Sequence, residues 1–112
     1  MNRRFVEKNP ETVKGVLRGI DRAVNFMGQH KKEAIAIMAG KLQLDEKFFH
    51  ETWDANVFEL SLDQALIMTM EDQARWAMTN GLTAKKDIPN YLKLIHQDAL
   101  LQVRPEAVTI IR

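Results

Sequence analysis

The feature that most limits the fold of this chain is a helical start signal followed by apolar residues at every third or fourth position. Asn9 stands where an N-cap is expected, Pro10 fits the first helical position, and Glu11 favours the positive end of a helix. The apolar residues that follow are Val13, Val16, Leu17, Ile20, Val24 and Met27. Because this spacing places them on one face, the pattern predicts an amphipathic helix over 10–28, which Gly28 ends.

Further helices are predicted where capping residues and apolar spacing agree. Asp45 is an expected N-cap, Ser61 and Gln64 form a capping box, and Asn80 with Gly81 supplies a left-handed stop. The resulting ranges are 31–42, 45–55 and 62–80, with short helices at 89–95 and 97–103. The sequence therefore predicts an all-α fold of four to five helices, in a single helical segment over 1–112.

Three expectations concern how these helices pack. The helices over 10–28 and 31–42 are expected to pair as a hairpin. Gly15 and Gly19 lie on or beside the first apolar stripe, and their cost in helix propensity is tolerable if another element approaches there closely. The helix over 62–80 carries apolar residues on two neighbouring faces, which indicates burial on two sides. Those residues are Leu62, Leu66, Ile67, Met70, Ala74, Trp76, Ala77 and Met78.

Composition limits the class of protein. The chain has 112 residues, 46% of them hydrophobic and 28% charged, which is typical of one compact globular unit. A net charge of +1 with interspersed signs gives no footprint for nucleic acid. Without cysteine there are no disulfides or thiol sites. No apolar run approaches the ~20 residues that cross a bilayer, and the first nine residues do not form a signal peptide.

No residue pattern predicts catalysis, a cofactor or a metal site. The histidines His30, His50 and His96 are not at a metal-ligand spacing, and Asp54 is close enough to His50 for only a weak ion pair. The one serine, Ser61, is explained as a helix cap. No phosphate loop is expected from the scattered glycines.

Two further binding sites are weighed and set aside. Trp53 and Trp76 could line a pocket, but aromatic residues at helical spacing usually belong to a core. A DNA-binding helix-turn-helix over 31–56 would present acidic residues, which phosphates repel. Ligand-binding residues therefore stay unknown at this stage.

The order of several short motifs resembles the C-terminal helices of periplasmic substrate-binding proteins of ABC importers, of the nitrate, sulfonate, taurine and thiamine-precursor type. A phrase of the form F-x-x-x-x-P-E-x-V runs from Phe5 to Val13, and Glu33 with Ala34 opens the next helix. The match continues with Phe58, Leu60, Ser61, Leu62, Gly81, Asp87, Ile88, Pro89, Leu100, Val103, Pro105, Glu106, Ala107 and Val108. The likeness covers nearly the whole chain.

This resemblance implies the C-terminal part of a type II periplasmic binding protein, which has two α/β lobes and no enzymatic activity. Its partners would be those lobes, an ABC permease and a small anion or heterocycle, and its location periplasmic or lipid-anchored outside the inner membrane. We expect the chain to be a fragment that does not bind solute alone, because the solute-binding residues would precede Met1. Its exposed apolar faces are expected to associate with the lobes or with one another.

Two other functions remain as alternatives to this interpretation. The first is a self-sufficient small helical module whose apolar groove receives a partner helix. The second is a helical enzyme subunit, for which no set of catalytic residues is found. Which solute the parent protein carries is not readable from this chain.

Overall fold

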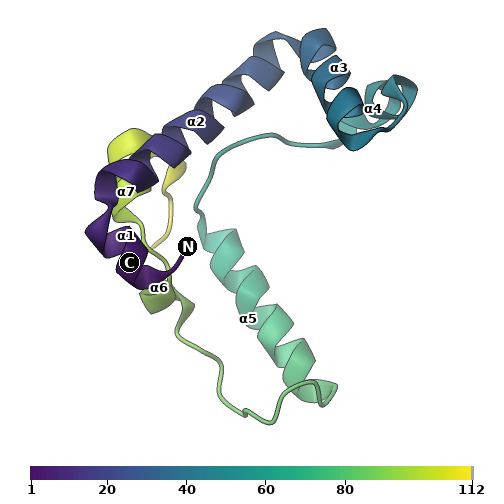
Figure 1. Cartoon of the computed structure of the whole chain (residues 1–112). Coiled ribbons are helices and arrows are strands. Elements are labelled where there is room, and N and C mark those ends of the chain that lie inside the picture. The colour runs from purple at the N-terminus through teal and green to yellow at the C-terminus, as the bar shows by residue number, and fades with distance from the viewer. Residues whose placement is uncertain (112) are drawn as a thin grey trace. The chain divides into compact units, whose positions relative to one another are not determined.

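The computed structural model describes residues 1–111 and confirms the all-α class. Within these residues there are helices and no strand (Figure 1). The α-helices are α1 (Arg3–Lys8), α2 (Pro10–Gln29), α3 (Lys31–Leu42), α4 (Glu46–Thr52), α5 (Gln64–Thr79), α6 (Tyr91–Leu94) and α7 (Asp98–Val103). Two 3-10 helices accompany them, η1 (Trp53–Ala55) and η2 (Pro105–Ala107).

The contacts within the chain form two compact units. Unit 1 comprises Met1–Lys14 and Ser61–Arg112, and unit 2 comprises Gly15–Leu60. The helix α2 begins in unit 1 and ends in unit 2. The single segment predicted over 1–112 stays a prediction.

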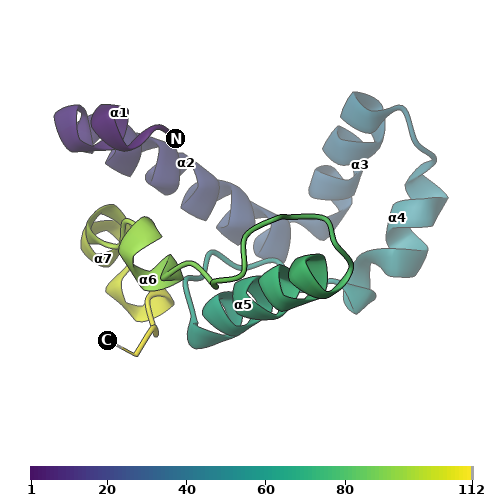
Figure 2. The same cartoon turned by 90° about the horizontal axis from the view of Figure 1, so that it is seen from below.

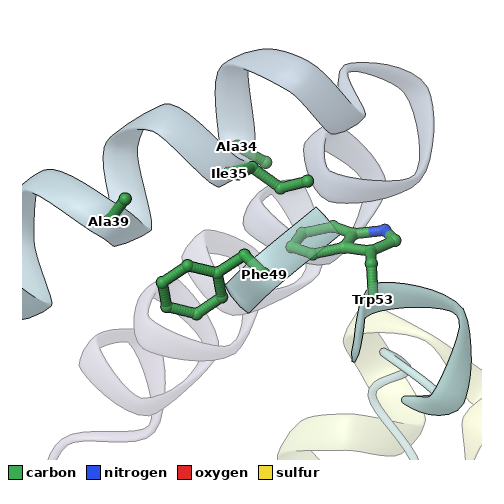
Figure 3. Close-up of a cluster of buried hydrophobic side chains, with 5 residues drawn as sticks. All are labelled: Ala34, Ile35, Ala39, Phe49 and Trp53. Atoms are coloured by element: carbon green, nitrogen blue, oxygen red, sulfur yellow. The ribbon is translucent and has the colours of Figure 1, made fainter. Parts of the chain in front are cut away.

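Unit 2 is built around a small hydrophobic core between α3 and α4. Three residues of α3 face two aromatic side chains of the next elements (Figure 3). The five buried members are Ala34, Ile35, Ala39, Phe49 and Trp53. Ile35 has no exposed surface. The aromatic rings therefore close over the face of α3 that carries Ile35.

The predicted hairpin of 10–28 with 31–42 is wrong. The element that packs along α3 is α4, and α2 reaches the core through Phe26 and Met27 near its end. Gly28 does not end the helix but stays within it, and α2 and α3 are separated by His30 alone. The His30 amide donates to the carbonyl of Phe26 at 2.8 Å. Because a single residue connects α2 to α3, the aromatic side chains of α4 and η1, and not the length of α2, pack against α3.

The turn between α3 and α4 contains a residue in the left-handed region. Gln43 has φ 55° and ψ 43°, and the Leu44 amide donates to the Ala39 carbonyl at 3.1 Å. This is the hydrogen bond of a Schellman stop, at a position where glycine is usual. Asp45 then caps α4 as predicted, because its carboxylate accepts from the Lys47 amide at 2.9 Å.

The predicted cap of α5 is wrong, because Asp63 and not Ser61 caps this helix. The Asp63 carboxylate accepts from the Leu66 amide at 2.9 Å. Ser61 is too early in the chain, since Leu62 is held in an extended bridge to Val108. The Leu62 amide donates to the Ala107 carbonyl at 2.8 Å, and the Leu62 carbonyl accepts from the Thr109 amide at 3.0 Å. This distant pairing delays the start of α5 to Gln64.

The predicted stop at Asn80 and Gly81 is confirmed. Gly81 has φ 69°, and the Leu82 amide donates to the Ala77 carbonyl at 2.9 Å. The chain then doubles back, so that α6 contacts α5 (Figure 2). The short helices predicted near 89–95 and 97–103 correspond to α6 and α7.

The sequence did not predict α1. Asn2 caps it by accepting from the Arg4 amide at 2.8 Å. The Asn9 side chain turns back to α1 and donates to the Phe5 carbonyl at 3.0 Å, so it ends α1 instead of capping α2. A hydrogen bond of 3.2 Å from the Arg3 guanidinium to the Lys93 carbonyl ties α1 to α6.

The glycines of α2 and the apolar belt of α5 have open surroundings. A Cβ built on Gly15 or Gly19 meets nothing within 4 Å. On α5 only Ile67 is buried, and Trp76 is 61% exposed. The burial of the α5 belt on two sides therefore stays a prediction.

Replacing Gln43 by glycine is expected to raise the free energy of unfolding. Glycine avoids the steric cost that a Cβ adds at positive φ, a gain of about 0.5–1 kcal/mol. Urea unfolding followed by circular dichroism measures it. Gln43→Ala is the matched control, because it removes the side chain and keeps the Cβ. An unchanged or lower stability of Gln43→Gly would contradict the left-handed turn.

Alanine substitutions separate the two proposed caps of α5. Asp63→Ala is expected to cost about 1 kcal/mol, the usual loss for an N-cap. Ser61→Ala is expected to stay within about 0.5 kcal/mol, as for an ordinary surface change. The same urea unfolding compares them, and a larger loss for Ser61→Ala would restore the cap predicted from the sequence.

Candidate functional site

The three histidines lie in different parts of the chain. His30 lies between α2 and α3, where its ring stacks on Phe26 with centroids 4.9 Å apart. Its Nδ1 is 3.9 Å from the Glu33 carboxylate. His50 and His96 are exposed on other parts of the chain. Within residues 1–111, no group of three or more histidine, aspartate or glutamate side chains could hold a metal ion.

The ion pair that the structure shows for Asp54 is with Lys31 and not with His50. Asp54 lies in η1, beyond the end of α4, and its carboxylate is 3.5 Å from Lys31 Nζ. Both side chains of this pair are exposed. An exposed pair of this length contributes little to stability, on the order of 0–1 kcal/mol.

The remaining sequence candidates have structural roles or none. Ser61 is exposed in the segment before α5, and its backbone leads into the Leu62 bridge. Trp53 is buried in the core of unit 2, with its ring 4.7 Å from that of Phe58. Trp76 lies on an exposed part of α5. Trp53 therefore belongs to a core, whereas Trp76 is exposed on α5.

A hollow with mainly apolar walls lies beside the core of unit 2. We call it the aromatic groove, and its volume is about 480 Å³. Its lining residues are Met38, Phe48, Phe49, Thr52, Trp53, Ala55, Asn56 and Phe58. The 3.6-residue period of α4 places Phe48, Phe49 and Thr52 along one side, and the 3-10 turn of η1 brings Trp53 and Asn56 to its end.

The two polar side chains that line the aromatic groove, Thr52 and Asn56, both donate to backbone carbonyls. The Thr52 hydroxyl donates to the Phe48 carbonyl at 2.8 Å, and the Asn56 amide donates to the Thr52 carbonyl at 2.7 Å. The other lining side chains are aromatic or aliphatic. A ligand in this groove would therefore be held by apolar contact and not by specific hydrogen bonds. Phe48, Phe49 and Trp53 come from one stretch of the sequence, whereas Met38 and Phe58 come from outside α4 and η1.

A second hollow, at the C-terminal end of α5, carries positive charge. Arg75, Lys85 and Lys86 line it, together with Thr79 and Thr83. Arg75 already pairs with Asp72 at 2.8 Å and with Glu71 at 3.7 Å. The end of α5 also contributes the negative pole of its dipole, which disfavours an anion. These contacts explain Arg75 without a ligand.

The buried residues within 1–111 are all hydrophobic, as far as the side chains are described. One polar atom, the side-chain oxygen of the half-buried Gln97, is buried without a hydrogen-bond partner. A catalytic acid, base or nucleophile normally draws its altered reactivity from burial or from a close charged partner. The arrangement mainly supports apolar contact surfaces.

No protein family, curated protein or solved structure matches this chain. None of the helices in residues 1–111 has the length and apolar character needed to span a bilayer.

The neighbouring residues Phe48 and Phe49 offer a matched test of the core. Phe49 is 7% exposed and Phe48 is 53% exposed. Phe49→Ala is therefore expected to cost about 3 kcal/mol or more, the usual loss for a buried aromatic ring. Phe48→Ala is expected to cost less than about 1 kcal/mol, as a change at a largely exposed position.

Tryptophan fluorescence measures this difference in unit 2 alone. In a Trp76→Phe background, Trp53 is the one remaining tryptophan and reports on the core that contains Phe49. Urea should shift the Trp53 emission at a lower concentration in Phe49→Ala than in Phe48→Ala. Equal midpoints for the two variants would contradict the packing of α3 on α4.

Proposed function

We propose that this chain is the C-terminal helical part of a solute-binding protein for an ABC importer of a small anion or heterocycle. In this role it supports the α/β lobes of a type II binding protein and does not bind solute alone. The protein would act in the periplasm or from a lipid anchor outside the inner membrane. Its solute belongs to the nitrate, sulfonate, taurine and thiamine-precursor class.

The observation that carries this proposal is the number of large apolar side chains that are exposed in the two units. Fifteen large hydrophobic side chains of residues 1–111 are exposed, and both units contribute to them. A monomeric soluble protein rarely exposes large contiguous apolar patches.

Some of the exposed apolar side chains belong to α2 and α5, two helices for which the sequence predicts apolar faces. On α2, Val16 and Ile20 are 43% and 44% exposed, although they belong to the predicted apolar stripe. On α5, Leu66 and Trp76 are exposed as well. Large apolar surfaces on a protein usually mark places where another surface binds. We propose that the α/β lobes cover them.

The chemistry of the described residues agrees with a supporting role. The polar groups of the aromatic groove bond to backbone carbonyls, and the buried residues are hydrophobic. A small anion needs convergent donors such as helix N-termini or arginine side chains. In the proposed protein the lobes supply these donors. Solute then drives closure of the lobes because it makes its full contacts only in the closed state.

The isolated chain is expected to behave as an incomplete protein. Its uncovered apolar surface should bind a hydrophobic dye such as ANS, and its thermal unfolding should be broad. It should also self-associate in sedimentation at micromolar concentration. A monomeric chain that unfolds sharply and reversibly without binding dye would contradict the proposal.

The exposed tryptophan of α5 tests whether the lobes cover this face. Trp76→Ala is expected to change the stability of the isolated chain by less than about 0.5 kcal/mol, because the residue is largely exposed. In the full-length protein the same change should lower the free energy of unfolding by about 3 kcal/mol, since a buried tryptophan is then lost. Asp72→Ala, at another exposed position of α5, is the control and should have little effect in either protein. A small effect of Trp76→Ala in both proteins would show that the lobes leave this face open.

A self-sufficient helical interaction module is the second candidate. The aromatic groove favours it, because an open apolar groove can receive the apolar face of a partner helix. Such a module must unfold cooperatively by itself. The dye and unfolding measurements described above therefore separate the two candidates, since the module predicts a sharp transition and little dye binding.

A further inference from the structure

We draw no further inference here: the strongest candidate, the aromatic groove between α3, α4 and η1 in unit 2, belongs to the site already described, and nothing in the structure shows what covers it.

Discussion

The amount of apolar surface that the helices can bury against one another limits the rest of this structure. The chain is 46% hydrophobic, but only eleven hydrophobic residues are buried within residues 1–111, and four of these are alanines. Burial stabilises by roughly 25 cal/mol for each Å² of apolar surface, so half-exposed stripes leave much of this contribution unused. The strongest local burial is the packing of Phe49 and Trp53 over Ile35. Elsewhere the amphipathic helices present apolar faces for which the described residues provide little cover.

This shortage of burial connects the fold with the proposed function. An amphipathic helix in a protein gains most of its stability when its apolar face packs against another surface. We propose that the α2 stripe and the outer residues of α5 are surfaces that pack against the rest of a larger protein. The resemblance to importer binding proteins, drawn from the order of short motifs, names a protein of that kind. The two arguments are independent, since one rests on sequence order and the other on exposed area.

Local signals in the sequence predicted much of the secondary structure. Asp45 and Gly81 act as expected because a cap or a left-handed stop depends on a few adjacent residues. Ser61 failed as a cap because the deciding contact, the bridge of Leu62 to Val108, lies far along the chain. The prediction of the hairpin was wrong for a related reason. The aromatic residues Phe49 and Trp53, which follow Asp45 in the sequence, pack against α3 in place of α2. The short helix α1 was missed because its cap at Asn2 precedes a turn with little apolar spacing.

The candidate site was only partly predictable for the same reason. The spacing of Phe48, Phe49 and Trp53 indicates an aromatic face, but the groove needs Met38 and Phe58 from other elements. The Thr52 and Asn56 side chains donate hydrogen bonds to nearby backbone carbonyls. These hydrogen bonds depend on the path of the backbone from α4 into η1. Neither residue type nor spacing in the sequence predicts these hydrogen bonds.

The central claim, that this chain is part of a larger binding protein, is tested most directly by translating the source DNA upstream of the Met1 codon in the same frame. The account predicts an open frame that continues back through two α/β lobes to a secretory signal. A stop codon immediately upstream, with a ribosome-binding site before Met1, would contradict it and favour the self-sufficient helical module.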